Sequence, residues 1–373
     1  MAVVISGSGL YTPPQTVSND ALVAAFNEYV RRWNEEHAAD IAAGRAEALE
    51  PSSSEFILKA SGIKSRHVVD ASGIVDPEIM RPQIRRRSND EPSLLCEMAL
   101  AAAKQALDQA GRSPSEIDGV LVACSNLQRA YPAIAVEVQH YLGTGGYAFD
   151  LNVACASAAF GVQTAVDAVA SGSARAVLAL NPEICSGHLN FRDRDSHFIF
   201  GDAATALVIE QAPAEPKSPH AFEIVSTRLL TRFSNNIRNN LGFMNRCETP
   251  SREPDDLLFV QDGRQVFKEV VPIVSELIAS ELAARGIEPG RVKRYWLHQA
   301  NLSMNQLILK RVLGRPAEEV IAPIVLDEYA NTSSAGSVIA FHKFHEDLAP
   351  GEIGVLCAFG AGYSAGLAIL RKL

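Results

Sequence analysis

The sequence predicts an α/β layered fold, duplicated so that two pseudo-symmetric halves give an α/β/α/β/α arrangement. Strand-like apolar runs alternate with helical periods along all 373 residues, which is typical of strands and helices packed in layers. The chain also repeats itself, because residues 110–117 resemble residues 285–292 and both follow a long helical period and lead into a strand. In addition, a Phe-Gly pair at position 200 and another at position 359 each open a closing strand.

Each expected element has a local reason. Short apolar runs bounded by turn residues predict strands at residues 2–6, 119–123, 176–180, 205–209, 353–359 and 363–370. A small or apolar stripe with a glycine close behind its end predicts helices at residues 97–110, 158–170 and 266–285. The last two strands lie in an uncharged stretch whose glycines favour a tight turn over a membrane span.

The two halves are expected at residues 1–212 and 213–373. Their boundary falls at residues 211–219, where Ala, Pro, Lys and Ser cluster. Residues 27–51 and 70–92 fit neither half, so both are predicted to be surface insertions. The first has a helical pattern, and the second contains the run Arg85 to Arg87, which fits a solvated basic run or a docking patch for a partner.

Composition excludes several classes of partner and site. The chain has 34 Lys and Arg against 43 Asp and Glu, a formal net charge of −9 at pH 7. A surface of that charge repels nucleic acid and anionic membranes, so neither is expected as a partner. The six cysteines include no Cys-x-x-Cys pair and no Cys/His zinc spacing. With no signal peptide visible at residues 1–10, the sequence predicts a reduced, cytoplasmic protein with no metal site.

The strongest local signal is residues 150–158, where a strand turns through small residues into a helix. Cys155 is expected at the N-terminus of that helix. There the helix dipole and unpaired backbone N–H groups stabilise a thiolate. Considered alone, Cys155 fits a nucleophile and a buried core cysteine equally.

The repeat supplies two partners for Cys155. Asn331 is its counterpart in the second half, in another small-residue entry to a predicted helix. His298 follows a predicted strand, and functional groups gather at the carboxyl ends of strands in such sheets. Together the three residues form a Cys/His/Asn set of the kind that nucleophilic acyl transfer requires.

At these residues the chain resembles the β-ketoacyl-acyl-carrier-protein synthase III family of the thiolase superfamily. The resemblance spans almost the whole chain, through residues 62–67, 130–132, 150–158, 200–203, 266–268, 298–301, 331–333 and 359–362. It implies a thiolase-like fold and an acyltransferase of fatty acid biosynthesis that needs no cofactor.

The resemblance also implies a condensation in two stages. Cys155 would first take an acyl group from a thioester, which is expected to be acyl-coenzyme A. His298 and Asn331 would then hydrogen-bond the thioester oxygen of malonyl-acyl carrier protein while carbon dioxide leaves. The backbone N–H groups of Cys155 and Ala361 would hold the oxyanion at the acyl carbon.

Further positions concern partners. The resemblance implies a homodimer in which Tyr131 reaches toward the partner's acyl tunnel, although an ordinary interface or core aromatic fits Tyr131 equally. Lys268, Lys310 and Arg311 match basic positions near the family's tunnel mouth, where an acidic carrier protein would dock. Each alone is an ordinary surface cation, so only their clustering would count.

The chain departs from the family where coenzyme A is expected to bind. The family's Asp-Glu-Trp-Ile segment, whose tryptophan helps to hold the adenine, is Ser-Glu-Phe-Ile at residues 54–57. Phe56 with the charge of Lys59 is expected to substitute for it. The family's basic residues downstream are replaced by Ala60 and Ser303.

Two further departures concern the acyl chain. Gly336 is one extra residue after the Asn331 turn, which predicts a wider or redirected acyl tunnel. Together with the insertion at residues 27–51, it resembles the branch of the family that extends medium-chain primers such as octanoyl.

Four alternatives are considered. A thiolase is disfavoured because Cys357 stands three residues before Gly360 and not directly before the glycine turn. A synthase III-like acyltransferase of secondary metabolism shares Cys155 and His298, so the sequence separates it poorly. A non-catalytic partner subunit is disfavoured by the intact Cys/His/Asn set. A hydrolase is the weakest alternative, because no acidic residue is seen to orient His298.

Overall fold

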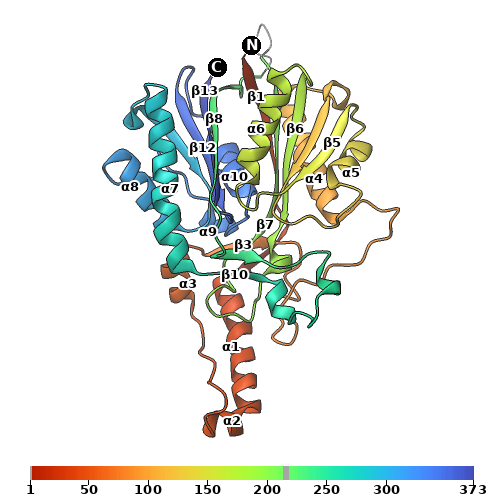
Figure 1. The fold of residues 1–373 in the computed structure, drawn as a ribbon, viewed down its shortest axis with the longest axis vertical. Coiled ribbons are helices and arrows are strands. Elements are labelled where there is room, and N and C mark those ends of the chain that lie inside the picture. Colours follow the sequence, from red (N-terminus) through yellow and green to blue (C-terminus); the bar gives the residue numbers. More distant parts are fainter. Residues whose placement is uncertain (1, 213–217) are drawn as a thin grey trace.

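The computed structural model describes residues 2–212 and 218–373, and its centre is a nine-stranded sheet (Figure 1). The first half of the sheet contains β1 (Val3–Tyr11), β4 (Gly119–Ala123), β5 (Tyr147–Leu151), β6 (Ala176–Ile184) and β7 (Asp202–Gln211). The second half contains β8 (Phe222–Thr231), β11 (Val292–Leu297), β12 (Ile353–Gly360) and β13 (Ser364–Lys372). The halves join where β1 pairs antiparallel with β8.

Helices form three layers around the two halves of the sheet (Figure 1). The central layer is α6 (Ser157–Ala170) and α10 (Ala335–Lys343), which contact strands of both halves. An outer layer of α4 (Leu94–Ala110) and α5 (Ile134–Leu142) covers the first half. The opposite outer layer, α7 (Gly263–Ala284) and α8 (Leu302–Leu313), covers the second half. The buried cluster between the halves includes alanine and valine side chains of α6 and α10, whose small size lets these helices pack closely.

This arrangement confirms the duplicated α/β fold. The strands of the first half run in the order β5-β4-β6-β7-β1, and those of the second run β11-β12-β13-β8, so the four strands shared by the halves occur in the same order. All six predicted strands and all three predicted helices are present. The boundary predicted at residues 211–219 includes residues 213–217, which lie outside the described residues, so the division into residues 1–212 and 213–373 stays a prediction.

The sheet brings three chain segments to one end of the molecule. β4 runs parallel to β5 and β6, and β11 runs parallel to β12, so their carboxyl ends point the same way within each half. Cys155 follows the end of β5, His298 follows the end of β11, and Gly360 ends β12. The central helices α6 and α10 also begin at this end, at Ser157 and Ala335, shortly after Cys155 and Asn331.

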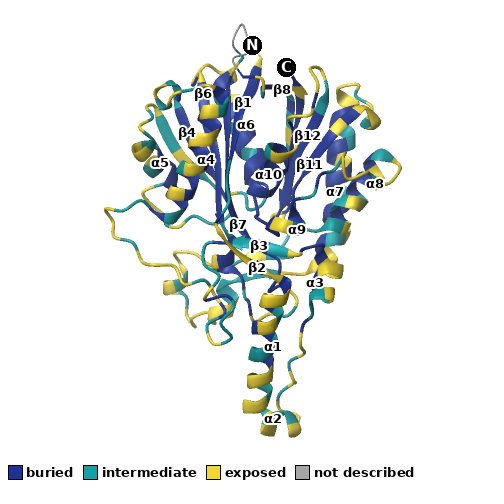
Figure 2. Cartoon of the chain, turned by 180° about the vertical axis from the view of Figure 1, so that it is seen from behind, coloured by how far each residue is buried: buried dark blue, intermediate teal, exposed yellow. Residues whose placement is uncertain are grey.

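The first predicted insertion forms an arm that projects from the sheet (Figures 1 and 2). It contains α1 (Asn19–Glu36) and α2 (Ala38–Ala42), and the chain returns to α3 (Ser54–Ser61). The helix predicted here therefore exists, but it begins earlier than residue 27. The side-chain amides of Asn27 and Asn34 bind the backbone of the returning chain at Ser52 and Leu49.

The second insertion is a loop between β3 (Ser65–Val68) and α4, without a helix or strand in the described residues. Arg85 pairs with Glu91, and Arg87 pairs with Glu97 and donates to the carbonyl of Pro92. Two of the three arginines of the predicted basic run are thus partnered by carboxylates.

The remaining elements are short. They are β2 (Gln15–Ser18), β9 (Ile237–Asn239), β10 (Phe259–Gln261) and α9 (Leu326–Tyr329). Within the described parts of the chain, no helix combines the length and the apolar composition that crossing a bilayer needs.

Candidate active site

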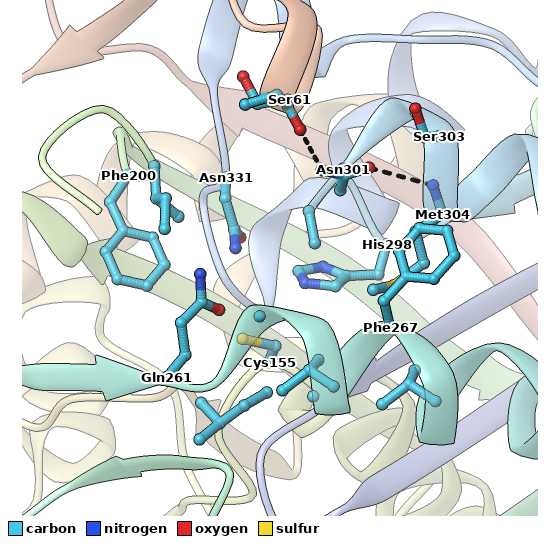
Figure 3. Close-up of a pocket in the computed structure, with 18 of the residues that line it drawn as sticks. Ser61, Cys155, Phe200, Gln261, Phe267, His298, Asn301, Ser303, Met304 and Asn331 are labelled. Carbon is cyan, nitrogen blue, oxygen red and sulfur yellow. Dashed lines mark hydrogen bonds between the residues drawn. The ribbon is translucent and has the colours of Figure 1, made fainter. Parts of the chain in front are cut away.

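A cavity of about 400 Å³ lies at the end of the sheet where these segments meet (Figure 3). Cys155, His298 and Asn331 all line it, so the structure brings together the three residues predicted from the repeat. The side chains of His298 and Asn331 face the space above the Cys155 sulfur in Figure 3. The volume falls in the range of about 300–1,000 Å³ typical of small-molecule sites.

Cys155 stands on a tight turn that leads into α6. The preceding residue, Ala154, has a φ of 47°, in the left-handed region that side chains rarely adopt. The Asn152 side chain accepts a hydrogen bond from the Ala154 N–H at 2.9 Å, and the Ser157 hydroxyl accepts one from the Val153 N–H at 2.8 Å. These bonds fix the turn, and Cys155 remains partly accessible from the cavity.

Burial and nearby polar groups act on the Cys155 thiol in opposite directions. Burial raises the pKa of Cys155 to about 12. A hydrogen bond that the Ser333 hydroxyl donates to the sulfur at 3.3 Å acts in the opposite direction, and the charge of Glu183 raises the pKa further. Burial is the largest of these effects and disfavours the thiolate, whereas the start of α6 is expected to favour it, so the stabilised thiolate stays a prediction.

His298 is a neutral imidazole that is 2% exposed. Burial lowers the pKa of His298 to about 4, so the ring carries a single N–H at neutral pH. Its backbone is fixed on both sides, since its N–H donates to the Cys357 carbonyl at 2.8 Å and its carbonyl accepts from the Asn305 amide at 2.9 Å. Nδ1 is buried without a hydrogen-bond partner among the described residues, and a hydrogen bond with the Ser333 backbone raises the pKa of the ring less than burial lowers it.

Asn331 lies on a strained turn before α10. Ala330 and Ser333 on either side of it have φ values of 55° and 49°. The Asn331 side-chain oxygen accepts from the Ser333 N–H at 2.8 Å, so the amide N–H₂ group is the part left to donate into the cavity. Its backbone is held between Ile199 and Gly201 by bonds of 2.9 and 3.1 Å.

The sequence analysis missed Glu183, which supports this turn from below. Glu183 is fully buried, and its carboxylate accepts hydrogen bonds from the N–H and hydroxyl groups of both Ser125 and Ser334. Burial raises the pKa of Glu183 to about 7. A carboxylate near the end of the mostly apolar strand β6 was the available signal, because buried acids are retained only where they are hydrogen-bonded.

Gly360 explains why a glycine turn closes the cavity. A Cβ at Gly360 would lie 2.6 Å from the Cβ of Cys155, so no other residue fits without moving Cys155. Ala361, predicted to donate its backbone N–H to the oxyanion, is the next residue in the turn between β12 and β13, but it is not among the residues that line the cavity. Its role stays a prediction.

The side chains of Gln299 and Asn301, next to His298, hold neighbouring segments in place. The Gln299 side chain accepts from the N–H groups of Val325 and Leu326 and donates to the Leu297 carbonyl. Asn301 caps α8 and donates to the Ala60 carbonyl at 2.8 Å, which fixes α3 beside the cavity. Gly336 packs against Gln299 inside α10 and does not line the cavity, so nothing here supports its predicted effect on a tunnel.

Cys357, the residue that superficially imitates a second catalytic cysteine, lies in β12 and does not line the cavity. It is fully buried, and burial raises the pKa of its thiol to about 12. Cys357 is therefore a core residue, as the spacing argument against a thiolase predicts.

Aromatic and aliphatic side chains form most of the cavity wall. They are Phe198, Ile199, Phe200, Ile237, Phe259, Val266, Phe267, Val270, Met304 and Phe359. These residues come from six places in the chain, namely the segment before β7, the strands β9, β10 and β12, and the helices α7 and α8. Polar side chains such as Asp195, Gln261 and Arg264 also line the cavity, but its predominantly apolar wall suits a hydrocarbon chain or another uncharged thioester substituent.

Phe56 lies outside the cavity and packs with its edge against Phe198. The guanidinium of Arg194, 4.5 Å from the ring centroid, covers Phe56. The cation beside Phe56 is thus Arg194 and not the predicted Lys59, because residues 191–199 fold back against α3. Sequence spacing gives no signal for this contact.

The three predicted docking cations are exposed on two packed helices. Lys268 is on the first turns of α7, beside the cavity-lining residues Arg264 and Phe267. Lys310 and Arg311 are in the last turn of α8, about 10 Å along that helix from the cavity-lining Ser303. Tyr131 is 86% exposed and does not line the cavity of its own chain.

Comparisons with known proteins agree with this geometry. Family models described as 3-oxoacyl-[acyl-carrier-protein] synthase III and its C-terminal part match residues 149–229 and 282–372. The chain is 63% identical to a β-ketodecanoyl-[acyl-carrier-protein] synthase of Pseudomonas aeruginosa, over 93% of this chain and 99% of that protein. It is 29% identical to a β-ketoacyl-[acyl-carrier-protein] synthase III of Granulibacter bethesdensis, over 99% and 98% of the two chains.

Solved structures give the same result. The crystal structure of 3-oxoacyl-[acyl-carrier-protein] synthase III from Aquifex aeolicus superposes with a TM-score of 0.76 at 25% identity, and 99% of each chain is covered. The fold is therefore thiolase-like. The chain matches its relatives over nearly their whole length, and its apolar cavity contains the Cys/His/Asn set. The protein belongs to the β-ketoacyl-acyl-carrier-protein synthase III family, whose members are condensing acyltransferases of fatty acid synthesis.

Proposed function

We propose that this protein extends a medium-chain acyl primer, octanoyl in the first instance, by two carbons from malonyl-acyl carrier protein. The observation that carries the proposal is one apolar cavity that contains Cys155, His298 and Asn331 together. The relative that is 63% identical is named for a ten-carbon β-keto product, which an eight-carbon primer and a two-carbon unit would give.

In the first stage the Cys155 sulfur attacks the carbonyl carbon of acyl-coenzyme A. A sulfur–carbon bond forms to Cys155, the bond to the coenzyme A sulfur breaks, and coenzyme A leaves with the proton. Because burial raises the pKa of the Cys155 thiol, that proton departs as the bond forms. Backbone N–H groups of Cys155 and Ala361 would hold the oxyanion of this step.

In the second stage the bond between the malonyl carboxylate and its carbon breaks, and carbon dioxide leaves. The electron pair becomes an enolate whose oxygen accepts hydrogen bonds from His298 and Asn331. Both residues suit this role, since His298 is neutral and retains an N–H, and the Asn331 amide oxygen is already engaged by Ser333. The enolate carbon then bonds to the acyl carbon, and Cys155 is released and regains a proton.

The thioester carriers would dock around the mouth. The flat pair of Phe56 and Arg194 offers stacking surfaces for the adenine of coenzyme A. Lys268, Lys310 and Arg311 would receive the acidic carrier protein, and Arg264 at the cavity mouth adds a cation that sequence reasoning overlooked. Because the whole chain has a net charge of −9, such a local patch is needed for an acidic partner to approach.

The proposal includes a homodimer. β5 is the edge strand of the sheet and pairs only with β4 among the described residues. Around this edge, Tyr131, Val136, Tyr141 and Phe149 are large side chains with at least 40% exposure. A second copy that covers this edge would bury them and bring Tyr131 toward the partner.

The test is mass spectrometry of intact protein after incubation with acyl-coenzyme A thioesters of increasing chain length. We expect an adduct that is largest near octanoyl in the wild type and is absent in the Cys155→Ala variant. Acylated protein given malonyl-acyl carrier protein should then yield the β-keto product and lose the adduct.

Two other results would overturn parts of the proposal. An adduct formed only from acetyl-coenzyme A would contradict the medium-chain primer. No adduct from any coenzyme A thioester would contradict this donor and favour a carrier-bound donor or a non-catalytic partner subunit.

A further inference from the structure

A second group of reactive side chains lies at the opposite end of the molecule from the cavity. His220 precedes β8, and His345 and Glu346 follow α10. The start of β8 pairs with the end of β13, next to the C-terminus, whereas the cavity lies at the other end of β13 (Figure 1). In the described part of the chain, only these three residues form a group of three or more His, Cys, Asp or Glu whose ligand atoms lie within 4.8 Å of one another.

The hydrogen bonds of His345 fix which of its nitrogens is free. Nδ1 lies 2.9 Å from the Phe341 carbonyl and 3.1 Å from the His342 carbonyl, so it must carry the proton and donate. Nε2 then carries the free lone pair of the ring. It is buried and has no hydrogen-bond partner in the described structure. His345 as a residue is only 1% exposed.

An imidazole with one nitrogen on a backbone carbonyl and the other without a partner has the arrangement that metal binding requires. Metal-ligating histidines almost always donate their second N–H in this way, which orients the ring and raises its basicity. The ring is also held in place by stacking on Phe341, with centroids 4.9 Å apart. His345 is therefore preorganised as a ligand by contacts within its own segment.

His220 and Glu346 can supply the other two protein ligands of a metal site. The His220 ring meets the His345 ring edge to face at 5.6 Å, and His220 Nδ1 lies 3.9 Å from Glu346. Zinc bonds of about 2.0–2.2 Å need these atoms to move slightly closer, which the exposed Glu346 side chain permits.

The neighbouring charges set the type of ion. Lys372 donates to the Pro219 carbonyl and is the cation whose field acts on both His345 and Glu346. His342 is close by but engages Ser8 at 2.8 Å. One carboxylate and one nearby ammonium leave little negative charge for a hard cation such as Ca²⁺, whereas two imidazoles suit a borderline transition metal.

We propose that His220, His345 and Glu346 bind one divalent transition-metal ion, Zn²⁺ by ligand type, and so fasten the start of β8 to the end of α10. With three protein ligands, the fourth position of a tetrahedral site belongs to water. The site is independent of the condensation described above. It links α10, whose first turn follows the Asn331 loop, to the strand that opens the second half of the sheet.

The test uses the full chain, treated with EDTA and carrying Cys247→Ser so that the exposed thiol cannot bind the metal. Zn²⁺ is titrated by calorimetry, and the melting temperature is measured with and without Zn²⁺. We expect one equivalent to bind and the melting temperature to rise, because a ligand specific to the folded state stabilises it. Co²⁺ should give visible absorption bands without a thiolate-to-cobalt band.

The decisive comparison is between variants of partly accessible side chains. His220→Ala and Glu346→Gln should each weaken Zn²⁺ binding by about tenfold or more and remove the rise in melting temperature. His140→Ala, which changes an exposed histidine on α5, should leave both unchanged. Failure of the parent protein to bind Zn²⁺, or equal binding by His220→Ala, would overturn the site.

Discussion

The turns before α6 and α10 occupy equivalent places in the two halves, yet they are held in different ways. The Cys155 turn is fixed mainly by its own neighbours, since Asn152 and Ser157 bind N–H groups one or two residues from Cys155. The Asn331 turn is fixed largely by distant segments, through Ile199, Gly201 and the buried Glu183.

This difference suits the chemistry of each turn. A nucleophile needs one accessible atom at a sharp corner, and a short segment can build that corner alone. A hydrogen-bond donor must match the position of an oxygen on a second substrate, so its turn benefits from rigid attachment to the surrounding strands. Changes at Glu183 should therefore disturb the Asn331 turn more than the Cys155 turn.

The largest expected effect is on the rate of condensation, and it distinguishes the Asn331 turn from the Cys155 turn. Asn331→Ala should lower condensation with malonyl-acyl carrier protein by about 10²–10³-fold, because it removes a donor to the enolate oxygen. Acylation by octanoyl-coenzyme A should change by only a few-fold, whereas Cys155→Ala abolishes it. Single-turnover mass spectrometry measures both steps, and equal losses of both in Asn331→Ala would contradict the separation.

Glu183→Gln should affect the two turns in opposite directions. Gln can still accept from the N–H groups of Ser125 and Ser334, but the weaker bonds should loosen the Asn331 turn and lower condensation by about tenfold. Removing the charge should also lower the pKa of Cys155, because the Glu183 charge raises it.

The measurement is the rate of Cys155 alkylation by iodoacetamide between pH 8 and 10, with Cys155→Ala as the background control. The alkylation profile of Glu183→Gln should shift to lower pH than that of the wild type. An unchanged profile would show that the Glu183 charge does not reach the nucleophile.

The same carboxyl predicts a pH dependence of stability. Burial raises the pKa of Glu183 from 4.5 to about 7, so the folded protein holds a proton that the unfolded chain releases in this interval. The free energy of unfolding contributed by this group therefore falls as the pH rises from 4.5 to about 7. Relative to Glu183→Gln, the wild type should lose stability between pH 5 and 7.5 in urea unfolding.

Asp202 also contributes to the pH dependence of stability. Burial raises the pKa of Asp202 to about 6, so its contribution to the free energy of unfolding also falls as the pH rises. Asp202 is present in both proteins, so the difference between them isolates Glu183. A constant difference across the interval would contradict the raised pKa.

The smallest expected effect tests the contact between the turns. The Ser333 hydroxyl donates to the Cys155 sulfur at 3.3 Å and lowers the pKa of Cys155. Ser333→Ala should therefore raise this pKa and slow alkylation at a fixed pH by about 2–10-fold, the value of one hydrogen bond. Cys155→Ala gives the background rate, and unchanged or faster alkylation in Ser333→Ala would refute the assignment.

Much of the fold followed from the sequence because its signals are local. Apolar runs, helical periods and glycine turns depend on neighbouring residues, so strands such as β4 and helices such as α6 were found with nearly correct ends. The repeat then paired Cys155 with Asn331, since duplicated segments occupy equivalent places. His298 was found because it follows a strand whose end could be predicted.

Other features depend on contacts between distant segments, so only the tertiary structure decided them. The buried support of Glu183, the placing of Arg194 over Phe56, and the group of His220, His345 and Glu346 each join elements far apart in the chain. The sequence predicted no metal site because its cysteines and histidines lack the short spacing of known motifs. The raised pKa of Cys155 likewise has no signal in the sequence, because the burial that raises it comes from the walls of the whole cavity. The sequence by itself thus determined the elements and the reactive set, whereas packing decided their charge states and supports, since burial is a property of the assembled chain.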